Sequence, residues 1–381
     1  MIRVGFNAFL LSSPHMRGWP RYTVNLLAAL PAWGVRPVLY SINPIHEVHL
    51  HPLPAGSFDL VPSGPMKYLR WEQSWLPRRC RADGIDLLHS PINFGLPWRS
   101  HCPRVLTLHD AIDQVYNAPK SHWRSRLRLA ALKSRFAAWS SRVRAHRIIT
   151  VSEHAKNDLV RLLKVPEARI RVTPEAADPV FHKPLTLEQR DAVHSKWNLA
   201  SRYVFYIGGW ELRKNIPFLL KGFAAAQCGD VDLVLAGGRE EQKADLVALA
   251  GELGIADRLR LLGFVPDEDL PALYANALAF VYPSEYEGFG LQLVEAMAVG
   301  CPVLAARATC LPEVLGSGGD TFALGEPGEL AMQLRRLATD DAYRSDLASR
   351  SLARSADFTW ARTAELTANV YRELVDRPNH A

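Results

Sequence analysis

Two glutamates flank the strongest chemical signal in the sequence, a glycine-rich turn between an apolar run and a helical pattern. Glu287 directly precedes Gly288–Gly290, and Glu295 lies within the helix expected from Leu291 onward. Glycine permits a sharp turn and a close backbone approach to a ligand, because it has no Cβ. The first N–H groups of a helix lack intrahelical partners and suit a phosphate. Either the two carboxylates grip hydroxyl groups at two ends of a ligand, or Glu287 complements the helix dipole and Glu295 lies at the surface.

Two more polar clusters stand where apolar runs end. Arg213 and Lys214 form a cation pair that can neutralise a diphosphate leaving group beside a helix start, although an ordinary surface pair is the alternative. His109 and Asp110 follow a run in the first half of the chain. A histidine there either faces a ligand or is a structural residue. Because the cation pair and the Glu287 turn follow strands of the same half, we expect them at one sheet edge.

The elements that must position these residues alternate between strands and helices. In the first half we expect strands at Arg3–Phe6, Pro37–Ile42, Asp86–His89, Arg104–Leu108, Arg147–Val151 and Ile170–Thr173, with helices at Tyr22–Leu30, Trp123–Val143 and Glu153–Leu163. In the second half we expect strands at Tyr203–Ile207, Asp232–Ala236, Arg258–Leu262, Ala279–Tyr282 and Val303–Ala305, with helices at Ile216–Ala226, Gln242–Leu253, Leu270–Ala275, Leu291–Val299 and Leu330–Leu337. Short apolar strands between helices are typical of parallel sheets covered on both faces.

This alternation predicts an α/β fold of two Rossmann-like domains that face each other across a deep cleft. The domains are expected at residues 1–178 and 202–360. Pro174, Pro179 and Pro184 interrupt the pattern and place a linker at residues 179–201. The last segment, residues 361–381, is expected to form a helix that crosses back to the N-terminal domain.

Composition and charge indicate where the protein is located and which partners it could bind. The chain has 381 residues, a net charge of +6 and five cysteines without metal-ligand spacing. A cytoplasmic location without disulfides or structural zinc is therefore expected. No apolar run is long enough to span a membrane, and the short apolar start is not expected to be a signal peptide. The region Lys120–Arg147 contains nine cations and no carboxylate. It is either a solvated helix face or a contact with an anionic membrane surface, and nucleic acid is not expected as a partner.

Two other enzyme classes find little support in the motifs. The D-x-D patterns Asp230–Asp232 and Asp267–Asp269 could suggest a metal-dependent transferase. The first precedes a strand and the second reads as the cap and first turn of a helix, so no metal site is expected. A nicotinamide enzyme would need G-x-G-x-x-G after a first strand, and neither half has it.

Taken together, the motifs resemble the retaining family 4 glycosyltransferases, which have the GT-B fold. Glu287–Glu295 matches the E-x7-E motif of that family with its Gly-Phe-Gly core, and Phe205–Phe223 resembles its strand–RKN–helix donor element. Further segments with a familial pattern are Thr150–Leu159, Gly263–Tyr274, Leu311–Val314 and His109–Asp110.

The resemblance implies a nucleotide-sugar donor bound by the C-terminal domain and an acceptor bound by the N-terminal domain, with no metal and no cofactor. It implies that Arg213 and Lys214 hold the donor diphosphate and that Glu287 and His109 lie at the transferred sugar. The remaining implied donor contacts are Glu295 to the ribose, Gly263 and Phe264 near the base, the backbone of Gly288, Phe289, Gly290 and Leu291 to the β-phosphate and sugar, and Gly18 in the first glycine-rich loop.

The sequence departs from the family pattern in three loops. Gly18-Trp19-Pro20 stands where the family has Gly-Ile-Gly, and Pro20 lacks an N–H, although proline suits the first turn of a helix. The loop Pro174-Glu175-Ala176-Ala177-Asp178 stands where many relatives carry Asn-Gly. Gly209 replaces an arginine that some relatives use for phosphate binding.

These observations predict a metal-independent, retaining hexosyltransferase that uses front-face displacement. The expected donor is GDP-mannose or a UDP-hexose, with mannose preferred, and the expected acceptor is a glycan or a lipid-linked oligosaccharide of polysaccharide biosynthesis. The protein is expected in the cytoplasm or at the inner face of the cell membrane. The alternative is a catalytically inactive scaffold or sensor subunit that binds a nucleotide sugar.

Overall fold

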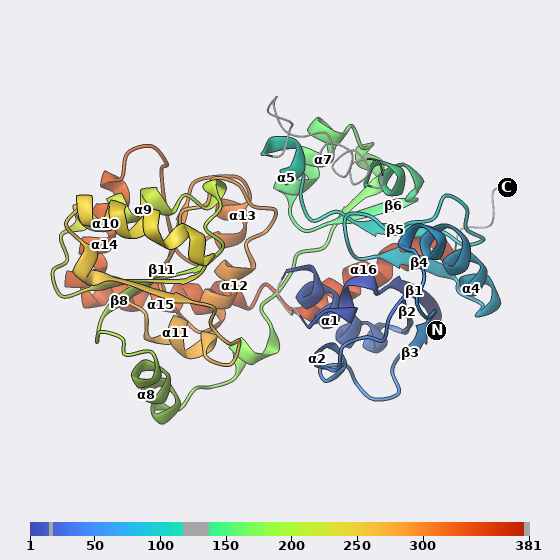
Figure 1. Ribbon diagram of the computed structural model, residues 1–381, viewed down its shortest axis with the longest axis horizontal. Helices are drawn as coiled ribbons and strands as arrows, with labels where there is room; N and C mark the ends of the chain where they lie inside the picture. Colours follow the sequence, from blue (N-terminus) through green and yellow to red (C-terminus); the bar gives the residue numbers. More distant parts are fainter. Residues whose placement is uncertain (15–17, 117–135, 137, 377–381) are drawn as a thin grey trace. The chain divides into compact units, whose positions relative to one another are not determined.

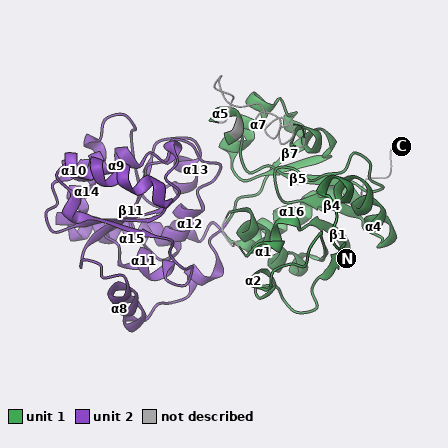
Figure 2. Cartoon of the chain, viewed as in Figure 1, with its two compact units in different colours: residues 1–175, 359–381 green, residues 176–358 purple. Residues whose placement is uncertain are grey.

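The protein is described by a computed structural model that covers residues 1–14, 18–116, 136 and 138–376. It divides the chain into two compact units, which Figure 2 distinguishes by colour. Unit 1 comprises Met1–Glu175 and Thr359–Ala381, and unit 2 comprises Ala176–Phe358. Each unit contains one parallel sheet with its helices (Figure 1).

The sheet of unit 1 has seven parallel strands in the order β3-β2-β1-β4-β5-β6-β7. The strands are β1 (Ile2–Asn7), β2 (Val35–Ser41), β3 (Asp59–Pro62), β4 (Leu87–Ser90), β5 (Arg104–Thr107), β6 (Arg147–Thr150) and β7 (Ile170–Val172). The central strand β4 is buried at every position, as expected for a strand with both faces covered. The direction of the strand order changes between β1 and β4, and ligands of doubly wound sheets bind at the carboxyl ends beside such a point.

Among the described residues of unit 1, the helices with both bounds placed are α1 (Trp19–Ala29), α2 (Glu47–Leu50), α3 (Tyr68–Arg70), α4 (Leu76–Ala82), α5 (Ile112–Val115), α7 (Glu153–Leu163) and α16 (Trp360–Val375). Helix α7 has the predicted bounds, and the Ser152 hydroxyl accepts a hydrogen bond from the N–H of Ala155 at 3.0 Å. This is the side-chain cap expected for serine at a helix start. Most of the helix predicted at Trp123–Val143 lies outside the described residues.

Helix α16, the last helix of the chain, packs within unit 1. It lies beside α1 (Figure 1) and returns to elements far away in the sequence. The Thr363 hydroxyl donates to the carbonyl oxygen of Pro174 at 2.6 Å, and the Tyr371 hydroxyl lies 2.7 Å from Nδ1 of His89. An ion pair of 3.0 Å joins Arg171 to Glu373. These contacts fix the end of the chain to the sheet of the first unit.

The sheet of unit 2 has six parallel strands in the order β10-β9-β8-β11-β12-β13. The strands are β8 (Tyr203–Gly208), β9 (Asp232–Gly237), β10 (Leu259–Gly263), β11 (Ala279–Tyr282), β12 (Val303–Ala306) and β13 (Asp320–Phe322). The helices are α8 (Leu187–Lys196), α9 (Ile216–Ala226), α10 (Lys243–Glu252), α11 (Leu270–Asn276), α12 (Leu291–Ala298), α13 (Leu311–Leu315), α14 (Gly328–Thr339) and α15 (Asp341–Ser355). The strand order has the doubly wound form, with its change of direction between β8 and β11.

Residues 179–201, expected as a linker, carry regular structure and belong to unit 2. Asp178 caps a short 3-10 turn, Pro179–His182, and Thr186 forms a capping box with Gln189 at the start of α8. Helix α8 packs against α11. Of the three prolines, Pro174 belongs to unit 1, Pro179 begins the 3-10 turn, and Pro184 lies between that turn and α8.

Candidate active site

Two loops at the carboxyl edge of the unit 2 sheet carry the predicted donor residues. The first follows β8 and contains Arg213 and Lys214, and the second follows β11 and contains Glu287. Since β8 and β11 are neighbouring parallel strands, both loops leave the same edge of the sheet. The N–H of Glu285 donates to the carbonyl oxygen of Arg213 at 2.7 Å and ties the two loops together. The site thus lies where the strand order changes direction.

The carboxylate of Glu287 is the centre of a buried polar network. Its Oε1 accepts hydrogen bonds from Lys214 Nζ at 2.6 Å, from Arg213 Nη1 at 3.1 Å and from the Tyr282 hydroxyl at 3.0 Å. Only 8% of Glu287 and 5% of Lys214 is exposed. Burial raises the pKa of Glu287, but the positive charges of Lys214 and Arg213 outweigh it and hold the pKa below its ordinary value. Glu287 is therefore a buried carboxylate paired with two cations.

The structure does not support the two simpler interpretations, a surface Arg-Lys pair and a Glu287 that only complements the helix dipole. Lys214 is buried, so the Arg-Lys pair is not an ordinary surface pair. The carboxylate of Glu287 contacts the two cations, whereas α12 begins only at Leu291. The structure brings together Arg213 and Lys214 from one motif and Glu287 from another.

The turn between Glu287 and α12 depends on Gly290. This residue has a φ of 92° and precedes the first residue of α12, Leu291. A Cβ on Gly290 would lie 3.2 Å from Cδ2 of Leu311 and 3.3 Å from Cε1 of Tyr282. In the described structure no side chain caps the N-terminus of α12. The first N–H groups of α12 therefore suit the phosphate contact that the motif predicts.

Thr309 and Cys310 support this turn and were not predicted. The hydroxyl of Thr309 accepts the N–H of Glu287 at 3.2 Å. The thiol of Cys310 contacts the carbonyl oxygens of Glu287 and Phe289, each at 3.3 Å. Thr309 and Cys310 directly precede α13, and the segment Leu311–Val314 of this helix has a familial pattern. The position of that segment could have indicated that the two residues before it contact the turn.

Glu295 lies on α12 and is buried, with 4% exposed, so the alternative that it is a surface residue does not hold. Its Oε2 accepts a hydrogen bond from the Tyr274 hydroxyl of α11 at 3.1 Å.

Gly263, with a φ of 68°, ends β10, and the next residue, Phe264, is 74% exposed. Phe264 thus offers an aromatic surface at a strand end, where a nucleotide base is expected to lie.

In unit 1, His109 follows β5 and is almost fully buried. Its Nδ1 lies 3.0 Å from Oε1 of Glu175, and its Nε2 lies 3.0 Å from the carbonyl oxygen of Pro91. Burial alone would lower the pKa of His109, but the hydrogen bond and charge of Glu175 outweigh it, so the pKa is raised above its ordinary value. The rings of Trp19 and Tyr22 pack against the imidazole. Sequence reasoning missed Glu175 as a partner, although it had marked the loop as unusual.

Gly18 is the N-cap of α1 and has a φ of 67°. Trp19 and Pro20 form the first helical positions, and the N–H of Tyr22 donates to the carbonyl oxygen of Gly18 at 3.1 Å. Pro20 therefore stands where a helix does not use the N–H, as proline in a first turn should. The departure from Gly-Ile-Gly leaves a regular helix start at this loop.

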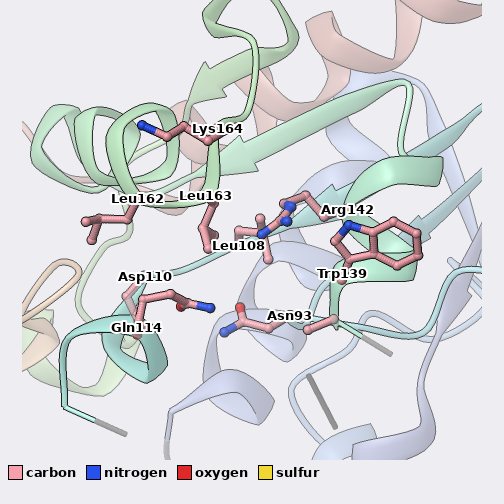
Figure 3. A pocket seen from close by; sticks show the side chains of 10 residues that line it. Asn93, Leu108, Asp110, Gln114, Trp139, Arg142, Leu162, Leu163 and Lys164 are labelled. Atoms are coloured by element: carbon pink, nitrogen blue, oxygen red, sulfur yellow. The ribbon is translucent and has the colours of Figure 1, made fainter. Parts of the chain in front are cut away.

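A pocket of about 440 Å³ opens in unit 1 beside the end of β5 (Figure 3). Figure 3 shows the side chains of Asn93, Gln114 and Arg142 directed toward the pocket centre, with the Trp139 ring at one side. The other lining residues are Leu108, Asp110, Ala138, Leu162, Leu163 and Lys164. The pocket combines amide groups, a cation and a flat aromatic ring, which are groups that bind carbohydrate hydroxyls and faces.

Carboxylates of the two D-x-D patterns are paired with basic side chains. Asp232 accepts from Arg260 at 3.0 Å. Asp269 accepts from Lys196 at 2.7 Å and from the indole N–H of Trp197 at 2.9 Å. Asp269 is the N-cap residue of α11, as its place before the helix predicts, but its side chain makes no cap hydrogen bond. These carboxylates hold α8 and the strands of unit 2 in place.

Comparison with known proteins supports the assignment of both units. The model "Glycosyltransferase Family 4" matches residues 16–181, and the model "Glycosyl transferases group 1" matches residues 189–354. The chain is 35% identical over 307 residues to the O-antigen chain mannosyltransferase B of Escherichia coli, a match that covers 79% of this chain and 77% of that protein. The chain belongs to the family 4 glycosyltransferases. It is also 30% identical over 238 residues to the serotype-specific mannosyltransferase WbdA of Escherichia coli, covering 61% of this chain but only 29% of that protein.

Solved structures confirm the GT-B fold of this glycosyltransferase. The crystal structure of Anabaena Alr3699/HepE in complex with UDP and glucose matches with a TM-score of 0.74 and 20% identity, over 98% of this chain and all of the other. At this identity the likeness establishes the fold alone. The two parallel sheets in doubly wound order are the two Rossmann-like halves of that fold.

Proposed function

We propose that this protein is a retaining, metal-independent mannosyltransferase that moves mannose from a nucleoside-diphosphate sugar to a glycan or lipid-linked acceptor in polysaccharide biosynthesis. The buried network of Arg213, Lys214 and Glu287 carries the proposal. The similarity to the O-antigen chain mannosyltransferase B supports mannose as the sugar. GDP-mannose is the proposed donor, with a UDP-hexose as the second candidate.

The network suits the diphosphate of a donor because it contains two cations and one carboxylate. It therefore carries one net positive charge in a largely buried position, where further negative charge is stabilising. Arg213 and Lys214 would neutralise the charge that develops on the leaving diphosphate, and the start of α12 would add backbone N–H donors. No metal is required for this neutralisation.

Glu287 is proposed to bind hydroxyl groups of the transferred sugar and to hold the two cations in place. Its hydrogen bonds to Lys214, Arg213 and Tyr282 stabilise the ionised form and make it a poor covalent nucleophile. Transfer with retention then follows front-face displacement. The acceptor oxygen bonds to the anomeric carbon on the face from which the diphosphate leaves, and the acceptor proton moves to a diphosphate oxygen. Glu295 is proposed to bind the ribose, and Gly263 and Phe264 to lie at the base.

The pocket in Figure 3 is the proposed acceptor site. Trp139 offers a flat face for a sugar ring, and the amides of Asn93 and Gln114 offer donors and acceptors for hydroxyls. Asn93 also accepts the N–H of His109 at 3.2 Å. The pocket is thus linked to the histidine that the family pattern places near the transferred sugar.

A peripheral contact with the inner face of the cell membrane is also proposed, for a cytoplasmic enzyme. Trp98, Phe136 and Trp139 form an exposed aromatic cluster, and the guanidinium of Arg144 lies 3.9 Å from the ring centre of Trp98. Aromatic rings with cations favour an anionic bilayer surface. None of the helices in the described part of the chain is long and apolar enough to cross a bilayer. Most of the basic region Lys120–Arg147 lies outside the described residues.

The membrane proposal is tested with vesicles of anionic and of zwitterionic lipid. The protein should sediment with anionic vesicles, and replacing Trp98 and Trp139 by serine should reduce the bound fraction. Equal binding by the wild type and the variant, or no preference for anionic lipid, would contradict the proposed contact.

The transferase proposal is tested by incubating the full chain with GDP-mannose, UDP-glucose or UDP-galactose, with and without EDTA. GDP-mannose should release GDP slowly without acceptor and faster with a mannose-terminated lipid-linked oligosaccharide, and EDTA should change neither rate. The product should keep the α-anomeric configuration of the donor, as measured by NMR coupling constants. Nucleotide binding without any turnover would favour an inactive scaffold, and an inverted product would contradict retention.

A further inference from the structure

Glu175 has no part in the function proposed above, yet its carboxylate contacts the ring of His109. It lies in the loop Pro174–Asp178, where the sequence departs from the Asn-Gly of many relatives. The residue is 5% exposed, and its Oε1 lies 3.0 Å from Nδ1 of His109. On the other side of the ring, Nε2 lies 3.0 Å from the carbonyl oxygen of Pro91. Both nitrogens of the imidazole therefore contact oxygen atoms that normally accept hydrogen bonds.

The number of protons on the pair follows from these contacts. A backbone carbonyl oxygen can only accept, so Nε2 of His109 must carry a proton to bind Pro91. The contact between Nδ1 and the Glu175 carboxyl needs a second proton between them. Burial opposes a charge on the ring, but the hydrogen bond and the negative charge of Glu175 outweigh burial and favour keeping that proton on the ring. The pair is then an imidazolium beside a carboxylate.

The other groups that face His109 agree with a positive charge on the ring. From α1, Trp19 stacks at 6.1 Å and Tyr22 packs edge-on at 4.7 Å between ring centres. Burial raises the pKa of the Tyr22 phenol, so Tyr22 stays neutral. Asp110 adds negative charge that favours the imidazolium. His89 is kept neutral, because burial and then the charge of His109 lower its pKa to about 3.

We propose that Glu175 is a positioning residue that holds the His109 ring in one orientation and keeps it as a fixed imidazolium. His109 then contributes orientation and a constant positive charge to the site, and it does not accept a proton during the reaction, since neither ring nitrogen is available. The role in transfer rests on the proposed function, whereas the state of the pair can be measured without any substrate.

The first experiment is an NMR titration of the ¹⁵N-labelled full chain that follows the imidazole nitrogens, with a His109→Gln variant to assign the signal. In the wild type, His109 should remain doubly protonated at pH 7.5. Glu175→Gln keeps the size of the side chain and an oxygen that can accept from Nδ1, but it removes the charge. His109 should be neutral at pH 7.5 in this variant. A wild-type His109 that titrates in the ordinary range, or no change on substitution, would overturn the proposal.

The second experiment measures turnover against pH. Above the pKa of His109 in Glu175→Gln, turnover of the variant should fall by about tenfold per pH unit and recover in acid, where the ring is protonated again. If Glu175 had only a structural role, the variant would lose turnover by the same factor at every pH. Glu167→Gln makes the same change at an exposed glutamate of unit 1, 69% exposed, and should leave the profile unchanged.

The outcomes separate the two claims. Equal activity of Glu175→Gln and wild type at every pH would overturn the role of Glu175. A wild type with a doubly protonated His109 but no transfer from any donor would overturn the proposed function and support the assignment of the pair.

Discussion

Replacing Lys214 by methionine removes one cation from the Glu287 network and keeps most of the buried side chain. Glu287 would lose its shortest hydrogen bond, of 2.6 Å, and retain Arg213 at 3.1 Å and the Tyr282 hydroxyl at 3.0 Å. Removing one partner of a buried ion pair costs about 3–5 kcal/mol, because the remaining charge loses its compensation. Since Arg213 remains, we expect a loss of about 3 kcal/mol in the stability of unit 2.

Two further variants test whether this loss comes from the unpaired carboxylate. In Lys214→Met combined with Glu287→Gln the network contains no carboxylate that has lost a partner, so most of the stability should return while transfer activity stays lost. Lys243→Met is the matched control, because Lys243 pairs with Glu240, whose side chain is 79% exposed. Exposed pairs contribute about 0–1 kcal/mol, so this control should change stability little.

The assay is hydrogen–deuterium exchange of peptides that cover β8 and β11. It reports the local stability of unit 2, whereas a chain of two units need not unfold in one step. Faster exchange of these peptides in Lys214→Met, reversed in the double variant, is the expected result. Unchanged exchange in Lys214→Met, or additive losses in the double variant, would refute the view that Lys214 compensates a buried charge.

Three other predictions follow from single residues. The folded-state pKa of Glu287 lies below its ordinary value of 4.5. The ionised carboxylate therefore stabilises unit 2 above pH 4.5, and this stabilisation is lost as the pH falls through the folded-state pKa. Glu287→Gln should flatten the acid side of a curve of unit 2 stability against pH. His89 has a folded-state pKa of about 3 against 6.5 when unfolded. Acidification below pH 6.5 should therefore destabilise unit 1 by about 1.4 kcal/mol per pH unit, and His89→Gln should remove this dependence in exchange experiments on β4. Gly290→Ala adds a side chain at a φ of 92° and should cost about 1–2 kcal/mol and greatly reduce turnover, whereas a fully active variant would show that the turn tolerates a Cβ.

Strands such as β4, β8, β9, β11 and β12 could be predicted well from the sequence because their apolar runs are buried on both faces. Each predicted strand is present, with bounds that differ by one or two residues at most. The strands β3 and β13 were missed, since β3 alternates between half-buried and exposed residues and β13 has only three residues. Helix α15 was also missed, because its polar sequence has few apolar positions.

The residues of the candidate site could be predicted from the sequence only in part. Arg213, Lys214 and Glu287 could be predicted because each stands in a motif at a strand end. Their direct contact could not, because the sequence places both loops at one sheet edge but does not show which side chains pair there. Glu175 and Thr309 lie far in sequence from the residues they contact, and only the fold brings them together.

The central claim is that the Glu287 network binds a nucleoside diphosphate, and calorimetric titration tests it most directly. Wild type and Lys214→Met are each titrated with GDP, UDP, ADP and their hexose conjugates, with and without EDTA. One nucleotide should bind the wild type regardless of EDTA and bind Lys214→Met about 10- to 100-fold more weakly, the equivalent of a charged hydrogen bond of about 1.5–3 kcal/mol. Equal affinity for both proteins, or no binding by any of them, would contradict the donor site described here.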